Sequence, residues 1–134
     1  MAPHRFLNPQ AMPLTRGYTH VVETTGPGRT IYISGQLGMT ADGKFAGAPG
    51  DFLAQAVQCF ENLKLALAAV GATFDHVVKV TNYFVDMAHL PIYFEVRDRY
   101  VNTQAPPAST AVQISKLARD GALFEIEAIA VVPQ

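Results

Sequence analysis

The segment GALFEIEAIAVV, from Gly121 to Val132, alternates between two kinds of position along most of its length. A period of two is typical of a β-strand, in which successive side chains point to opposite faces. The first set of positions is wholly apolar and comprises Phe124, Ile126, Ala128, Ala130 and Val132. The second set begins with Glu125 and Glu127 and becomes apolar again at Ile129 and Val131. The segment predicts a strand with one core face and one mixed face.

The mixed face has two explanations. It can belong to a half-exposed edge strand whose two glutamates are solvated. It can also belong to a sheet that is covered by helices on its other face and packs its apolar part against another subunit, so that the carboxylates border a cleft. The pattern alone leaves both open. The preceding segment, ASTAVQIS from Ala108 to Ser115, is the expected companion strand.

Length and composition limit the classes of protein that need to be considered. With 134 residues, 49% hydrophobic and 16% charged, we expect a single globular domain over residues 1–134. The net charge is -1 and the ten lysines and arginines are scattered, so nucleic-acid binding is not expected. Apolar runs are too short to span a bilayer and no signal pattern opens the chain, which predicts a soluble, cytoplasmic protein without membrane attachment.

The cysteine and histidines indicate no metal chemistry. Cys59 is the single cysteine and lies within a helical apolar repeat, so it is expected to be a small buried side chain. His20, His76 and His89 are not spaced as metal ligands with carboxylates or with Cys59. We expect neither a metal site nor a cofactor.

The N-terminal part of the chain predicts a hairpin. Residues Met1–Thr15 contain three prolines and no sustained period, which indicates an extended arm or loop. Alternation from Tyr18 to Val22, turn residues from Thr25 to Gly28 and a second alternating run from Thr30 to Gln36 predict two paired strands.

Two helices and a central strand are expected next. From Asp51 to Gly71, apolar residues recur at three- and four-residue steps, with Asp51 suited to the N-cap and Gly71 to the C-cap. His76–Val85 is rich in β-branched and aromatic residues, as expected of a strand covered on two sides. A second helix is predicted for His89–Val101, with Arg97 and its charged neighbours exposed.

These elements predict an α+β fold with one mixed β-sheet and two helices on one face. If both helices cover the same face, the opposite face is left bare. This bare face carries Glu125 and Glu127, which favours burial against another subunit.

Five segments, in this order, resemble the Rid family, also called the YjgF-type or endoribonuclease L-PSP family. They are Gly17–Val21, Ile33–Gln36, the helix that contains Asn62, Val77–Thr81 and Phe124–Val131. The resemblance covers nearly the whole chain and implies a chorismate-mutase-like fold. It also implies a homotrimer with three clefts between subunits and a relation to enamine and imine deaminases.

The resemblance implies an active site, from which this sequence departs at one position. In active deaminases of this family, an arginine near the start of the penultimate strand grips a substrate carboxylate, and a glutamate on the last strand positions the hydrolytic water. The glutamate matches Glu125, but the arginine position is occupied by Ser109. The other matched cleft positions are Tyr18, Ser34, Gly35, Gln36 and, where asparagine is frequent, Phe94.

Serine supplies one neutral donor in place of five charged ones. The N–H groups and hydroxyls of Ser109 and Thr110 could still bind an anion, or Arg16 or Arg97 could reach the cleft. We expect a changed ligand in preference to either replacement.

Three functions are therefore considered. The favoured one is a deaminase-like hydrolase for a small enamine, imine or related C=N compound without the usual carboxylate, with Glu125 orienting water. The alternative is a trimer that binds a small metabolite without turnover. The third, a ribonuclease, is disfavoured because the sequence has neither a basic patch nor a histidine pair for acid–base catalysis.

Overall fold

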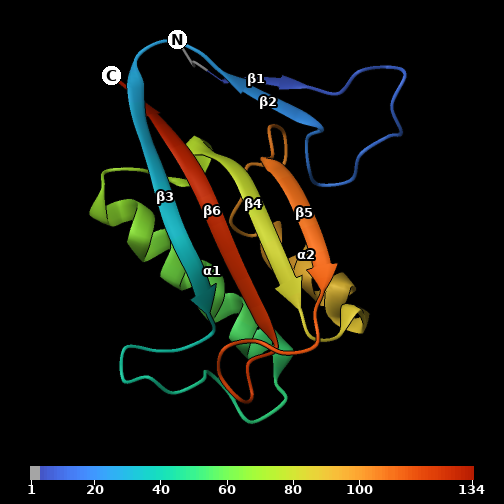
Figure 1. Cartoon of the computed structure of the whole chain (residues 1–134), viewed down its shortest axis with the longest axis vertical. Coiled ribbons are helices and arrows are strands. Elements are labelled where there is room, and N and C mark those ends of the chain that lie inside the picture. The colour runs from blue at the N-terminus through green and yellow to red at the C-terminus, as the bar shows by residue number, and fades with distance from the viewer. Residues whose placement is uncertain (1–3) are drawn as a thin grey trace.

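A four-stranded mixed sheet is the centre of the computed structural model, which describes residues 4–134. Its strands, in spatial order, are β3 (Gly28–Leu37), β6 (Phe124–Pro133), β4 (Val77–Phe84) and β5 (Ala108–Gln113). β6 is antiparallel to both neighbours, whereas β4 and β5 are parallel (Figure 1). The strand predicted from the alternating C-terminal segment is thus an interior strand, and not an edge strand with solvated glutamates.

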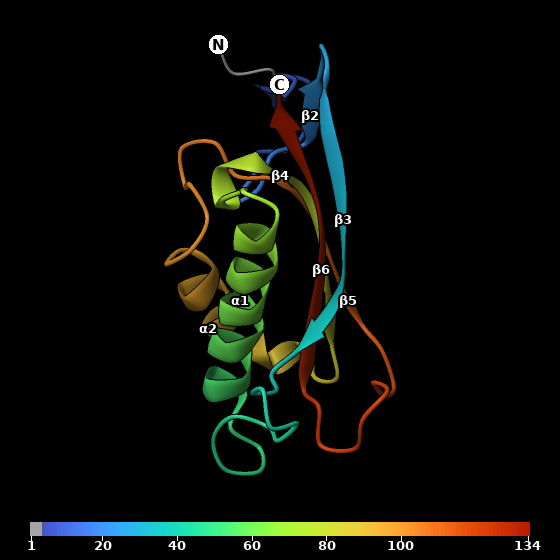
Figure 2. The same cartoon turned by 90° about the vertical axis from the view of Figure 1, so that its left-hand side faces the viewer.

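Both helices lie on one face of this sheet, as predicted (Figure 2). They are α1 (Phe52–Ala69) and α2 (Leu90–Arg97). The 3₁₀ turn η1 (Phe74–His76) leads from α1 into β4, and the 3₁₀ turn η2 (Met87–His89) leads from β4 into α2. The Asp51 side chain caps α1 by accepting a hydrogen bond from the Ala54 N–H at 3.0 Å, and Gly71 has the positive φ of 73° expected after the helix. α2 is shorter than predicted, because the chain turns at Asp98. None of the helices in residues 4–134 has the length and apolarity needed to cross a bilayer.

The hydrophobic core fills the space between the helices and the sheet. Phe60 and Leu63 of α1 are buried there with Phe124 and Ile126 of β6. Phe84 packs with its ring centroid 5.0 Å from that of Phe124. The apolar face predicted for β6 is therefore confirmed, and one core orients all four strands.

The predicted N-terminal hairpin is wrong. β2 (Val21–Thr24) does not pair with β3 but forms a separate antiparallel sheet with β1 (His4–Leu7), where Phe6 opposes Val22 (Figure 1). β1 lies within the predicted Met1–Thr15 loop; residues 1–3 are outside the described part. β3 instead pairs with β6, because this pairing places Ile33 in the core opposite Ala128.

The prediction that the strand from His76 to Val85 is covered on two sides is also wrong. β4 is an interior strand, but only Val80, Asn82 and their same-face neighbours meet the helices. Lys79 and Thr81 point to the other face, where they line a cavity with Glu127; neither helix lies on this face (Figure 2). The sheet therefore has one covered face and one bare face.

Candidate functional site

The bare face of the sheet gathers polar side chains from two neighbouring strands. β6 contributes Glu125 and Glu127. β4 places Thr81 opposite Glu127 and Tyr83 opposite Glu125. Because paired residues on adjacent strands share a face, these four side chains form one cluster.

Glu125 lies against the backbone of Gly35. A β-bulge interrupts the β3–β6 register between Ile33 and Gln36, and a Cβ at Gly35 would collide with the Glu125 carboxylate. Burial raises the pKa of Glu125, and the charge of Glu127 raises it further. The carboxylate is thus a better proton acceptor than a solvated one.

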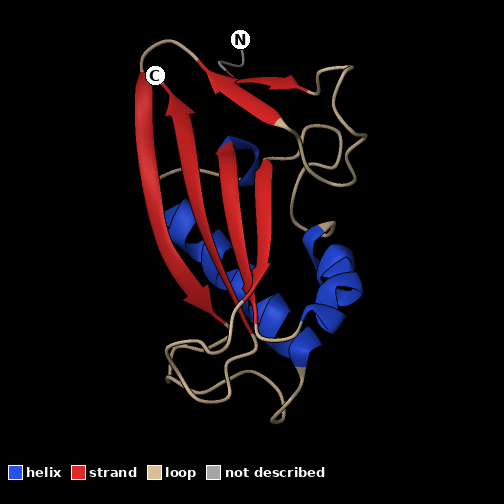
Figure 3. Ribbon diagram, turned by 45° about the vertical axis from the view of Figure 1, so that its right-hand side comes forward, coloured by secondary structure: helices blue, strands red, loops and turns tan. Residues whose placement is uncertain are grey.

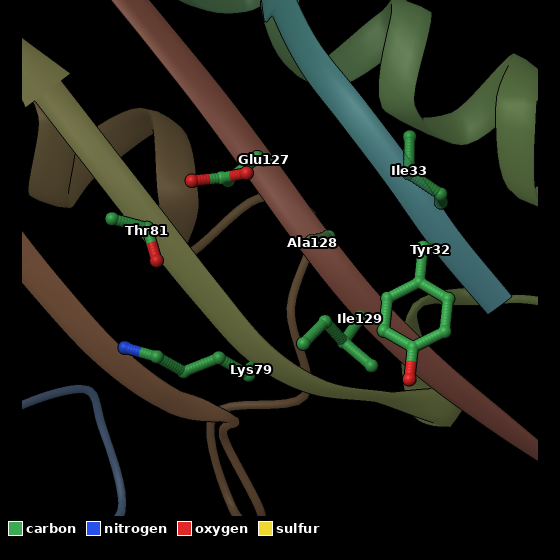
Figure 4. A pocket seen from close by; sticks show the side chains of 7 residues that line it. All are labelled: Tyr32, Ile33, Lys79, Thr81, Glu127, Ala128 and Ile129. Atoms are coloured by element: carbon green, nitrogen blue, oxygen red, sulfur yellow. The ribbon is translucent and has the colours of Figure 1, made fainter. Parts of the chain in front are cut away.

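The rest of the cluster is held by hydrogen bonds. The Tyr83 hydroxyl donates to Glu127, and the Lys79 ammonium donates to Thr110 Oγ1 at 2.7 Å. Burial lowers the pKa of Lys79. A cavity of about 220 Å³ adjoins this cluster, and Figure 4 shows the side chains that line it. It is lined by Tyr32, Ile33, Lys79, Thr81, Glu127, Ala128 and Ile129.

A second group of predicted residues lies at the outer edge of the sheet, around β5. Tyr18, Phe94 and Ser109 line one cavity of about 320 Å³. The loop between β1 and β2 brings Tyr18 there, because Thr19 donates hydrogen bonds from its N–H to Pro107 O (3.2 Å) and from its hydroxyl to Pro106 O (2.6 Å). Figure 3 shows this loop descending toward the β5 side of the molecule.

The two groups point to opposite faces of the sheet. Ser109 is paired with Val80, whose side chain faces the helices, whereas Thr110 is paired with Thr81 on the bare face. Glu125 also lies on the bare face. Within one chain, the position expected to grip substrate and the carboxylate expected to orient water are therefore separated by the sheet.

The remaining predicted residues stay near Glu125. Gly35 forms the backbone against which its carboxylate rests. Gln36 Nε2 donates to Ser34 O at 2.9 Å, which holds the bulge together. Ser34, Gly35 and Gln36 all belong to the ISGQ segment, from which they were predicted.

Several polar residues near these cavities were not predicted from the sequence. Lys79 and Tyr83 show a period of two with Thr81 that could have placed them on one face. Arg97 was expected to be exposed but is only 8% exposed, and it lines the cavity that contains Ser109. Its spacing of four from Tyr93 was the available signal. Within residues 4–134, no group of three or more histidine, cysteine, aspartate or glutamate side chains could hold a metal ion.

The chain is similar to known proteins in both sequence and fold. The family model described as endoribonuclease L-PSP matches residues 9–132. The chain therefore belongs to the endoribonuclease L-PSP, or Rid, family. A solved Rid family protein, YyfB from Yersinia pestis, superposes with a TM-score of 0.85 at 32% identity, covering 97% of this chain and 99% of its own. The Rid fold predicted from the sequence is confirmed.

Two relatives differ in what their names say. Protein DfrA from Myxococcus xanthus is 38% identical over 131 residues, covering 98% of this chain and 97% of its own length. A mouse protein named 2-iminobutanoate/2-iminopropanoate deaminase is 40% identical over 104 residues, covering 77% of this chain and 74% of its own. The Rid family membership and the named deaminases support a deaminase-like role.

Proposed function

We propose that this protein hydrolyses a small imine or enamine, with Glu125 orienting the attacking water. The observation that carries the proposal is the carboxylate itself, which is partly buried on a sheet face, rests against the Gly35 backbone and has a raised pKa. A pKa closer to neutral suits a group that must accept and then return a proton. An enamine would first convert to its imine tautomer.

The chemical steps require little beyond this carboxylate. Water attacks the imine carbon, its oxygen forms a bond to that carbon and one of its protons passes to Glu125. Glu125 returns this proton to the nitrogen, which gives a neutral carbinolamine. Glu125 then takes the hydroxyl proton of the carbinolamine and passes it to the nitrogen, the carbon–nitrogen bond breaks as the carbonyl forms, and the carbonyl product and ammonia leave. Hydrogen bonding of Tyr83 to Glu127 leaves Glu125 as the carboxylate without that partner for this role.

We further propose that the working site lies between subunits of a homotrimer. Glu125 and Ser109 face opposite sides of the sheet, so they can meet one substrate only if they come from different chains. The bare face offers the surface for such contact, since Tyr32 is 77% exposed there beside Ile129. A cleft would then combine the bare face of one subunit with the β5 edge of its neighbour.

Imine hydrolysis by the purified protein tests this function. An amino-acid oxidase generates 2-iminopropanoate in place, and release of the keto acid is followed beside the spontaneous reaction. We expect acceleration by the wild type and a loss of roughly 100- to 10,000-fold in Glu125→Gln, as for removal of a general base. Glu23→Gln, which changes an exposed glutamate paired with Arg5, serves as the matched control.

The outcomes are distinct. Equal rates for wild type and Glu125→Gln, with both proteins folded, would exclude Glu125 as the catalytic group. No acceleration for any imine would instead favour the alternative of a binding protein without turnover, for which the Ser109 substitution is the motivating observation.

A further inference from the structure

The cavity at the β5 edge contains a cation that the proposed hydrolysis has not yet used. It lies on the helix side of the sheet and has a volume of about 320 Å³. Its lining residues are Arg16, Tyr18, Leu90, Tyr93, Phe94, Arg97, Ser109 and Ala111. Two of them, Arg16 and Arg97, are arginines. They line the same cavity as Ser109, which occupies the family's arginine position.

Arg97 is held rigidly although it is charged. Its side chain is 10% exposed, and its guanidinium carbon lies 4.8 Å from the Phe94 ring centroid and 5.8 Å from that of Tyr93. On another side, the guanidinium lies so close to Gly17 that a Cβ there would collide with it. A guanidinium fixed in this way loses little further freedom when it binds an anion.

The Arg97 charge is only partly compensated. Nε donates a hydrogen bond of 2.9 Å to Oδ1 of Asp98, and Nη2 lies 2.9 Å from the same oxygen, while the Asp98 side chain is 48% exposed. Burial of a cation is costly unless it is fully paired and hydrogen-bonded. With Arg16 at the cavity mouth, the local charges of Arg16, Arg97 and Asp98 leave an excess of one positive charge, which suits a monoanion.

The cavity wall also contains a buried hydroxyl, that of Tyr93. It lies near Ser109 and Asn82, but forms no hydrogen bond of good geometry within residues 4–134. Asn82 on β4 donates from Nδ2 to Ser109 Oγ on β5 at 3.0 Å. Burial raises the pKa of Tyr93 to about 12, so its hydroxyl keeps a proton to donate. The Tyr93 hydroxyl can therefore donate to an oxygen of a molecule bound in the cavity.

We propose that Arg97 binds the carboxylate of the substrate, in place of the missing arginine on β5, and that the cavity selects carboxylates with an apolar or aromatic side chain. The proposal rests on the proposed hydrolysis and names its substrate class. Tyr18, Leu90 and Phe94 supply the apolar wall for that side chain. Under this proposal the ligand keeps its carboxylate. The arginine that binds it comes from α2, and not from β5.

Binding of keto acids, the products of the proposed reaction, tests Arg97 separately from turnover. Calorimetric titration would use phenylpyruvate, its methyl ester and pyruvate. We expect phenylpyruvate to bind more tightly than pyruvate and the ester to bind roughly 10- to 100-fold more weakly, because it lacks the charge. Arg97→Met should weaken phenylpyruvate binding by a similar factor. Arg99→Met, two positions along and exposed beside Glu95, should leave it unchanged.

Two further variants separate binding from folding. Asp98→Asn keeps Arg97 but removes its counter-charge, so phenylpyruvate should bind roughly two- to fivefold more tightly. Arg97→Met combined with Ser109→Arg should recover binding from the β5 side of the same cavity. A purely structural role of Arg97 would produce neither gain, and their joint absence in folded proteins would overturn the proposal even if Arg97→Met alone did not fold.

The result also distinguishes this proposal from the hydrolysis on which it rests. Glu125→Gln should lose turnover while still binding phenylpyruvate. If the wild type binds phenylpyruvate through Arg97 but shows no turnover, the proposed hydrolysis is refuted and the carboxylate site is retained. The opposite result has two forms: Glu125-dependent turnover with an unchanged KM in Arg97→Met, or equal affinity for phenylpyruvate and its ester. Either would refute the carboxylate site and retain the proposed hydrolysis.

Discussion

The two faces of the four-stranded sheet are made by alternate residues of the same strands, yet only one of them is completed by this chain. On the helix face, Phe124 and Ile126 are fully buried against α1 and its neighbours. On the bare face, Glu125 and Glu127 alternate with them and meet no helix; only the loop after β5 lines a cavity with them. The helix face supplies the hydrophobic core that stabilises the fold. The bare face leaves carboxylates available for the proposed reaction.

The largest effect is expected from Phe124→Ala on the covered face. The phenylalanine side chain is fully buried, and its ring contacts those of Phe52, Phe84 and Tyr93. Its removal should lower the free energy of unfolding by about 3–5 kcal/mol. Denaturant unfolding measures this loss.

Ile129→Ala, on the bare face of the same strand, is the matched comparison. It should cost a single chain much less, but should weaken self-association in sedimentation measurements if another subunit covers this face. Equal loss of stability in both variants, without any change of assembly, would show that the two faces are not divided in this way.

A smaller effect, confined to activity, is expected from Gly35→Ala. The added methyl group must displace the Glu125 carboxylate, whereas the bulge itself has no positive φ that requires glycine. Misplacing a catalytic group by about 1 Å can reduce turnover roughly 100-fold. Imine hydrolysis should therefore fall by about that factor, while the unfolding transition changes little.

Gly43→Ala provides the contrast for this variant. Gly43 has a φ of 78° and open space around its Cα, so alanine there strains the backbone without approaching Glu125. This variant should lose some stability but keep its turnover. If Gly35→Ala keeps full activity, Glu125 does not need the position that the structure gives it.

The sequence predicted the covered face better than the bare one, for a physical reason. A buried apolar face must repeat at the strand or helix period, and so Phe124, Ile126 and the α1 repeat were readable. Glu125 was found because a family resemblance pointed to it. The partner of β2 was missed because four residues at β1 carry too little pattern to compete with a hairpin between neighbours in sequence.

Arg97 was named as a possible replacement for the missing arginine, but its burial was not predicted. A charged residue next to Asp98 and Arg99 is normally solvated, and periodicity does not register a cation that packs on aromatic rings. Only the fold brings it to Ser109, since α2 and β5 are joined by a loop and meet at one cavity. The local sequence pattern therefore could not predict a cavity whose residues come from different elements.

The smallest expected effect is a gain of stability in Glu125→Gln. The pKa of Glu125 is raised above its ordinary value of 4.5, so the ionised carboxylate is less favourable in the folded than in the unfolded state. This penalty is absent below the unfolded pKa, grows as pH rises from the unfolded toward the folded pKa, and is complete above the folded pKa. The glutamine variant should melt slightly higher than the wild type at pH 7, and the difference should vanish on acidification.

Thermal unfolding of both proteins across that pH range measures this difference. Glu127→Gln removes only the second cause of the raised pKa and should give a smaller gain at neutral pH. A Glu125→Gln variant that melts lower than the wild type at pH 7 would show that the ionised carboxylate makes net favourable contacts. Glu125 would then belong with the residues that stabilise the fold, and the division between a stabilising face and a working face would fail at its most important position.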